Sequence, residues 1–166
     1  MSYALLIDDD EQLRSRLSSM AEMAGLRLET AATWQEGLEV FTSLSPDLVI
    51  ADYNLLGRDM GLSLLYRISQ LRPSVRLVLF SAFLDEDDAE AVVSMGPVHR
   101  VLSKLDPIYA AEEILKEVQL AETRSHESTD WNQLAASAIR AREVDQAQFE
   151  ALDDYLRANR LGGAES

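Results

Sequence analysis

Short runs of apolar residues, each about as long as one β-strand, recur along the first 120 residues and alternate with longer amphipathic segments. Three of these runs are residues 4–7, 48–51 and 77–80, and each is apolar at every position. An uninterrupted apolar run is typical of a strand whose two faces are both covered. The segments between the runs carry apolar residues three or four positions apart, which is the spacing of one helix face. The pattern therefore predicts an α/β protein with a doubly wound parallel sheet and helices on both faces.

Capping signals divide this pattern into ten alternating elements. Thr33 and Glu36 form a capping-box pattern, Gly25 follows the last periodic residue of one helix, and Asp106 precedes a proline at a first helical position. The predicted strands are residues 3–8, 27–31, 48–52, 76–81 and 98–103. The predicted helices are residues 11–24, 34–44, 60–72, 85–95 and 107–123. In doubly wound sheets, ligands bind beyond the carboxyl ends of the strands, so functional residues are expected at that edge.

The alternating pattern ends near residue 121, so residues 1–121 are predicted to form one domain. Residues 122–129 are polar and are predicted to be a linker. Residues 130–161 are predicted to form a helical extension of two helices, because apolar residues recur there at helical spacing and Asp145 with Gln148 forms a second capping box. The last five residues, 162–166, are predicted to be a disordered tail.

Charge and composition exclude several classes of function. The chain has 29 acidic and 15 basic residues and a net charge of −14, which repels nucleic-acid phosphates and anionic membrane surfaces. It has no cysteine and two histidines, so disulfides, thiol nucleophiles and cysteine-ligated metals are excluded. The N-terminus lacks the pattern of a signal peptide, and no run approaches the ~20 apolar residues of a membrane helix. A cytoplasmic protein without membrane contact is expected.

Four of the five predicted strands end in residues that carry chemistry. Asp8 and Asp9 follow the first strand, Asp52 ends the third, Ser81 the fourth, and Lys104 follows the fifth. Clustered carboxylates repel one another unless a cation lies among them, and Mg²⁺ suits such a site. A lysine and a hydroxyl beside that cation complete a phosphoryl-binding site. The central carboxylate, Asp52, is the natural nucleophile, because aspartate forms acyl phosphates.

These motifs resemble those of response-regulator receiver domains of two-component signalling. The resemblance covers roughly residues 2–121 and rests on residues 7–10, residues 46–52, Gly57, Gly61, Ser81-Ala82 and Ser103-Lys104, all in family order. It implies a flavodoxin-like fold with strand order 2-1-3-4-5.

The resemblance also implies a partner and a cofactor. Asp52 would accept a phosphoryl group from a sensor histidine kinase or a phosphotransfer protein. Asp9 would bind Mg²⁺ directly and Asp8 through a water molecule. Asp52 and the backbone carbonyl of Asn54 would complete the protein ligands of the metal.

Lys104 would pair with one phosphoryl oxygen and Ser81 with another, drawing its loop inward. The sequence departs from the family at three nearby positions. Val101 stands where an aromatic switch residue is usual, and Leu105 and Leu56 replace common prolines. None of these departures removes a reactive group, so they bear on the conformational response more than on phosphoryl transfer.

Residues 121–166 carry five basic and nine acidic side chains, a net charge of −4. A basic recognition face is therefore not expected, and the predicted output is contact with an unknown downstream protein or homodimerisation. A DNA-binding transcriptional regulator acting through the C-terminal helices remains an alternative. A Mg²⁺-dependent phosphohydrolase is a second alternative, disfavoured because Asn54 supplies no general acid two residues after Asp52. The chain is expected to dephosphorylate itself slowly rather than to turn over a substrate.

Overall fold

A computed structural model of the chain describes residues 3–55, 61–82, 84–126 and 154. The strands are β1 (Ala4–Ile7), β2 (Leu28–Ala31), β3 (Leu48–Asp52), β4 (Arg76–Ser81) and β5 (Arg100–Ser103). The helices are α1 (Glu11–Met23), α2 (Trp34–Leu44), α3 (Gly61–Leu71), α4 (Glu86–Met95) and α5 (Pro107–His126). All ten predicted elements are present in the predicted order, with ends that differ by at most three residues.

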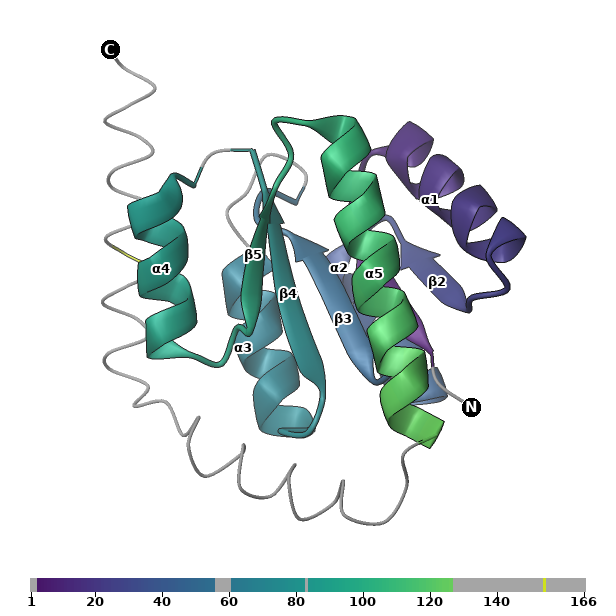
Figure 1. Cartoon of the computed structure of the whole chain (residues 1–166). Helices are drawn as coiled ribbons and strands as arrows, with labels where there is room; N and C mark the ends of the chain where they lie inside the picture. Colours follow the sequence, from purple (N-terminus) through teal and green to yellow (C-terminus); the bar gives the residue numbers. More distant parts are fainter. Residues whose placement is uncertain (1–2, 56–60, 83, 127–153, 155–166) are drawn as a thin grey trace.

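The strands form one parallel sheet in the order β2-β1-β3-β4-β5 (Figure 1). This confirms the predicted fold class. Residue 7 of β1 pairs with residue 51 of β3, and Asp52 pairs with Phe80 of β4. Ser81 in turn pairs with Ser103 of β5. This register aligns the carboxyl ends of β1, β3, β4 and β5 along one edge, where the chemically active residues were predicted.

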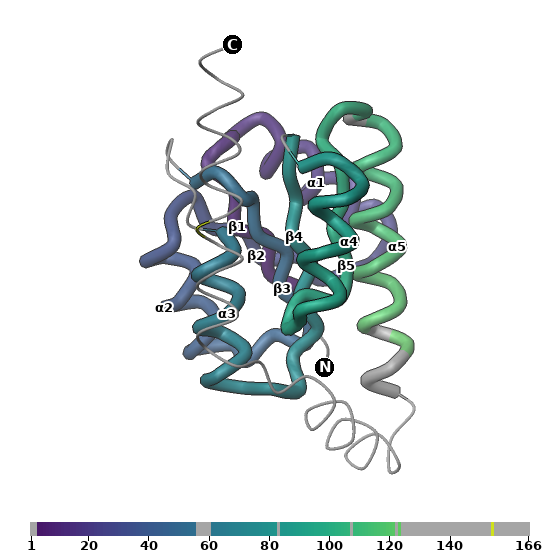
Figure 2. The backbone as a smooth tube through the Cα atoms, turned by 90° about the vertical axis from the view of Figure 1, so that its left-hand side faces the viewer, coloured from purple at the N-terminus to yellow at the C-terminus, as the bar shows by residue number. Residues whose placement is uncertain are grey.

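Two helical layers cover the sheet, and successive side chains of each strand pack alternately against one layer and the other. In β3, Leu48 and Ile50 pack towards α1 and α5, whereas Val49 and Ala51 pack towards α2, α3 and α4. Figure 2 shows α2 and α3 on one side of the sheet and α5 on the other. Because successive side chains of a strand point to opposite faces, a strand between two layers must be apolar throughout. This is the physical reason for the uninterrupted apolar runs.

Local capping agrees with the sequence signals. The Thr33 hydroxyl accepts a hydrogen bond from the Glu36 backbone N–H at 3.2 Å. The Asp106 carboxylate accepts from the backbone N–H groups of residues 108 and 109, both at 3.1 Å. Gly25 has a φ of +71°, a left-handed conformation that glycine adopts without strain.

Helix α5 continues to His126, three residues beyond its predicted end at 123. The first residues of the predicted linker, 122–129, are therefore helical. Ala121 is buried, which anchors the last part of α5, and the Thr123 hydroxyl donates to the Gln119 carbonyl at 3.0 Å. The predicted extension, residues 130–161, and the predicted disordered tail, residues 162–166, lie outside the described residues apart from position 154.

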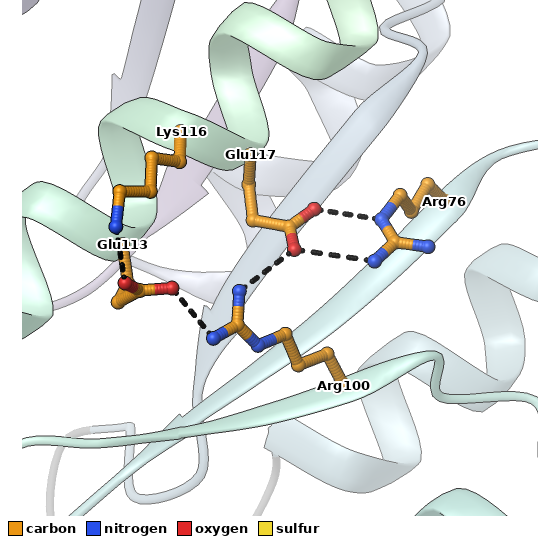
Figure 3. Close-up of polar contacts among 5 residues, drawn as sticks. All are labelled: Arg76, Arg100, Glu113, Lys116 and Glu117. Carbon is orange, nitrogen blue, oxygen red and sulfur yellow. Dashed lines mark hydrogen bonds and ion pairs between the residues drawn. The ribbon is translucent and has the colours of Figure 1, made fainter.

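An ion-pair network holds α5 against the amino ends of β4 and β5 (Figure 3). Glu117 accepts two hydrogen bonds from Arg76, at 2.7 and 3.1 Å, and one from Arg100 at 3.1 Å. Arg100 also binds Glu113 at 2.6 Å, and Lys116 binds Glu113 at 2.9 Å. Burial raises the pKa of Glu117, but the hydrogen bonds and charges of the two arginines outweigh burial and hold that pKa below its usual value. Arg76 and Arg100 begin their strands, so the network lies at the opposite end of the sheet from Asp52.

Candidate functional site

The three predicted carboxylates meet at the carboxyl edge of the sheet. Asp8 follows β1, and Asp52 is the last residue of the neighbouring strand β3. Asp8 is 0% exposed and Asp52 6%, whereas Asp9 faces solvent. One carboxylate oxygen from each residue lies within 4.8 Å of the other two. The arrangement offers one hard cation three anionic oxygens.

Lys104 joins this cluster from the end of β5. Its Nζ lies 2.6 Å from Oδ2 of Asp8 and 3.0 Å from Oδ2 of Asp52. The same ammonium lies 4.8 Å from the centre of the buried Phe80 ring, in a cation–π contact. One lysine therefore bridges two buried carboxylates that belong to different strands.

Burial controls the protonation of these groups. It raises the pKa of Asp52 to about 6, and the negative charge of Asp8 adds to this effect while Lys104 opposes it. Burial likewise raises the pKa of Asp8, although the hydrogen bond from Lys104 partly offsets it. For Lys104 itself, burial lowers the pKa, but the two carboxylates outweigh burial and raise it. The lysine is therefore held as a cation between two carboxylates that the fold makes reluctant to ionise.

Ser81 and Asn54 complete the predicted set. Ser81 is buried, and its hydroxyl accepts a hydrogen bond from the Leu84 backbone N–H at 3.3 Å. The Ser81 carbonyl accepts from the Lys104 backbone N–H at 2.9 Å, which ties the ends of β4 and β5 together. The backbone N–H of Asn54 donates to Oδ1 of Asp52 at 3.2 Å. All of the predicted site residues therefore lie at one edge of the sheet.

Two further residues shape the site. Arg14 of α1 donates from Nη1 to the Asp8 carbonyl oxygen at 2.7 Å. The sequence did not predict this contact. Its only sequence signal is a basic residue early in the helix that follows the acidic residues at the end of β1. Gly61 begins α3, and a Cβ there would lie 1.9 Å from the Asp52 carbonyl oxygen. Glycine is thus required where α3 approaches the backbone of Asp52. Gly57 lies outside the described residues.

The structure also locates two of the three departures from the family pattern. Val101 is half-buried and packs against the core formed with α2, α3 and α4. Leu105, directly after Lys104, is 81% exposed. Leu56 lies outside the described residues.

The fold and the site together define a class: flavodoxin-like α/β domains with an acidic pocket and a lysine at the carboxyl edge of the sheet. Residues 4–119 match the family model of the response regulator receiver domain, and the chain belongs to this family. It is thus a receiver domain of the two-component response regulators, as the sequence motifs predicted.

Three comparisons place the chain among its relatives. It is 29% identical over 177 residues to the nitrate/nitrite response regulator protein NarL of Escherichia coli K12, and this alignment covers 98% of this chain and 82% of NarL. It is 32% identical over 93 residues to the DNA-binding transcriptional regulator NtrC of Klebsiella pneumoniae, which covers 56% of this chain and 20% of NtrC. Among solved structures, a receiver domain protein of Clostridium thermocellum superposes with a TM-score of 0.63 at 24% identity, covering 76% of this chain and 98% of the other.

These relatives bear on the predicted partners. NtrC is described as DNA-binding, so the expectation that nucleic acid is not a partner is not confirmed. None of the helices among the described residues combines the length and the hydrophobicity of a membrane span. The cytoplasmic location stays a prediction.

Proposed function

We propose that Asp52 is the phosphoacceptor of a response regulator, receiving a phosphoryl group from a sensor histidine kinase or a phosphotransfer protein in the presence of Mg²⁺. The observation that carries this proposal is the buried Asp52 carboxylate, which lies beside Asp8 and Asp9 and is bridged to Asp8 by Lys104. Membership of the receiver family supports it.

The donor set fits a magnesium ion. Asp8, Asp9 and Asp52 offer three carboxylate oxygens, and the Asn54 backbone carbonyl follows two residues after Asp52. In addition, the side-chain oxygen of Asn54 is buried and has no hydrogen-bond partner among the described residues. Hard cations with oxygen ligands match such a set. When bound, Mg²⁺ would neutralise charge on the phosphoryl oxygens and hold Asp52 ionised.

The chemical step is a direct transfer. A carboxylate oxygen of Asp52 attacks the phosphorus of a phosphohistidine, the O–P bond forms as the N–P bond breaks, and the departing imidazole keeps the electron pair and takes up a proton. Lys104 pairs with a phosphoryl oxygen, exchanging its contacts with Asp8 and Asp52 for the new anion. The Ser81 hydroxyl donates to a second phosphoryl oxygen.

The response then travels through the ends of β4 and β5. Phosphorylation replaces the single negative charge of the Asp52 carboxylate with the roughly two negative charges of an acyl phosphate, and it brings three acceptor oxygens to this position. Ser81 and Lys104 would both turn towards them, and the backbone hydrogen bond between these residues makes their loops move together. Since Val101 carries no aromatic ring, we assign the readout to these two loops rather than to rotation of an aromatic side chain.

We propose that the output is contact with a downstream protein or formation of a homodimer, mediated by the predicted helical extension, residues 130–161. The acidic balance of residues 121–166 supports protein contact over DNA. A DNA-binding output remains the second candidate, because the relative NtrC is described as DNA-binding. A mobility-shift assay at physiological salt separates the two, since only the second predicts a retarded DNA fragment.

The direct test is phosphorylation by acetyl phosphate. Wild type incubated with Mg²⁺ and acetyl phosphate should gain one phosphoryl group by intact-mass spectrometry, and Asp52→Asn should gain none. Asp87→Asn is the matched control, because Asp87 is an exposed aspartate in the first turn of α4 and should leave labelling unchanged. Labelling of Asp52→Asn to the wild-type extent would refute the assignment.

A further inference from the structure

Arg14 reaches from α1 to the turn that carries Asp8 and Asp9. Its guanidinium Nη1 donates a hydrogen bond to the Asp8 carbonyl oxygen at 2.7 Å, and the side chain is half-buried. Neither phosphoryl transfer nor metal ligation, as proposed above, uses this residue. We propose that Arg14 is a positioning residue that holds the Asp8–Asp9 turn in the geometry required to bind a divalent cation. This inference rests on the proposed function.

The Asp8 carbonyl needs a partner from outside the sheet. The ladders of β1 with β2 and β3 both end at Ile7, so the buried Asp8 lies one residue beyond the regular strand pairing. A buried carbonyl without a partner is costly. Arg14 supplies that partner through a charge-assisted bond, which is stronger than a neutral one.

Other bonds fix the remaining polar groups of the same turn. The backbone N–H of Asp8 donates to the Ala31 carbonyl at 3.0 Å. Oδ1 of Asp8 accepts from the Asp10 backbone N–H at 2.9 Å. With the bond from Arg14, the turn is held on the amino side, on the carbonyl and at the side chain. The bond from Arg14 to the Asp8 carbonyl acts directly on the Asp8–Asp9 peptide plane, because that carbonyl belongs to it.

The orientation of that peptide plane determines the direction in which the Asp9 side chain, with its carboxylate, leaves the backbone. Asp9 is exposed, and the direction in which its side chain leaves the main chain is set by the backbone of this turn. A ligand that projects from a fixed backbone loses less conformational entropy when it binds a metal. Residues that orient metal ligands without touching the metal affect affinity by roughly 10–100-fold in metalloproteins.

The charge of Arg14 has the opposite effect on metal affinity. A guanidinium held at the backbone of the Asp8–Asp9 turn repels an incoming divalent cation. If charge alone mattered, removing Arg14 would tighten Mg²⁺ binding. If Arg14 positions the turn, removing it weakens binding. The sign of the change therefore separates the two roles.

The experiment is calorimetric titration of the full chain with Mg²⁺, together with thermal unfolding in the absence of metal. Arg14→Ala should bind Mg²⁺ roughly tenfold more weakly than wild type. Arg14→Lys keeps a cationic donor and should recover part of that loss. Arg16→Ala is the matched control, because Arg16 is an exposed arginine on the same helix, and its loss should leave affinity unchanged or slightly higher.

Equal or tighter Mg²⁺ binding by Arg14→Ala would overturn the positioning role. A similar affinity loss in Arg14→Ala and Arg16→Ala would also overturn it, since such a loss would follow the removal of any arginine from α1 rather than the bond to Asp8. If Arg14→Ala is unfolded, the order of affinities of wild type, Arg14→Lys and Arg14→Gln decides, with the lysine variant expected above the glutamine variant. Absence of Mg²⁺ binding by wild type would instead overturn the proposed function, and this inference with it.

Discussion

Lys104 and the proposed magnesium ion should compete for the same two carboxylates, and this makes a quantitative prediction for Lys104→Met. Lys104 compensates the negative charges of both Asp8 and Asp52, at 2.6 and 3.0 Å. The substitution keeps a long apolar stem but leaves two buried carboxylates without a cation. Breaking a buried ion pair by removing one partner costs about 3–5 kcal/mol.

The expected cost lies at the lower end of that range, because the Lys104 side chain is 20% exposed and water reaches the edge of the sheet. For a domain of this size, about 3 kcal/mol corresponds to a fall in Tm of roughly 10 °C. Mg²⁺ stabilises whichever state binds it, by about 2.7 kcal/mol at a free concentration 100 times its Kd. Wild type must release Lys104 to bind the ion, whereas the variant need not.

The assay is thermal unfolding of wild type and Lys104→Met over a series of Mg²⁺ concentrations. Without metal the two Tm values should differ by roughly 10 °C, and saturating Mg²⁺ should narrow that gap to a few degrees. Lys116→Met is the control, since the Lys116 side chain is 64% exposed and its loss should leave both the Tm and the Mg²⁺ response almost unchanged. A gap that Mg²⁺ does not narrow would show that lysine and metal do not share a site.

Three further predictions test other parts of the structure. Folding raises the pKa of Asp52 from 3.8 to about 6, so ionising this carboxylate destabilises the folded protein by an amount that increases as pH rises from about 4 to 6. In urea unfolding without metal, Asp52→Asn should therefore be more stable than wild type by about 3 kcal/mol at neutral pH, and by less at pH 5. Gly61→Ala would place a Cβ 1.9 Å from the Asp52 carbonyl oxygen, so α3 would have to move by about 1 Å and acetyl-phosphate labelling should slow at least tenfold. A labelling rate equal to that of wild type would contradict the importance of this close approach. Glu117→Gln should destabilise the fold by about 2 kcal/mol, because it removes the anionic partner of Arg76 and Arg100; the loss stays below the range for a fully buried pair, since both arginines are partly exposed and regain some hydration. Because the fold lowers the pKa of Glu117 from 4.5, this loss should shrink as pH falls below 4.5, and a loss that does not change with pH would argue against the ion pairs.

Signals confined to a few neighbouring residues predicted much of this molecule. The strand positions followed from apolar runs that only a doubly covered sheet explains. The Asp106 cap and the Gly25 terminus followed from the local backbone groups that those residues satisfy. The meeting of Asp8 with Asp52 followed from fold class, because parallel strands end at one edge. Each of these predictions needs only local chemistry and one topological rule.

Contacts between distant elements could not be predicted in the same way. Arg76 and Glu117 are 41 residues apart, and their pairing depends on how far α5 slides along β4. The extension of α5 to His126 is similar, because buried Ala121 holds a turn whose own sequence reads as polar linker. The Arg14 bond depends on a side-chain rotamer and on where the β1 ladder ends. Tertiary packing determines these contacts, and the spacing of apolar residues along the sequence does not predict them.

The energetics of the pocket explain why a buried acidic cluster suits a switch. Burial raises the pKa values of Asp8 and Asp52, and the single lysine, Lys104, partly offsets the free-energy cost of ionising them. Under the proposed function, a metal ion takes over the carboxylates, and Lys104 is then available for the incoming phosphoryl group. Because the Lys104 N–H also binds the Ser81 carbonyl, a shift of either residue pulls on the other loop. Under the same proposal, a receiver without an aromatic residue at position 101 has a direct connection from Asp52 to the ends of β4 and β5. Insertions that lengthen those two loops should therefore uncouple output from phosphorylation without preventing phosphoryl transfer.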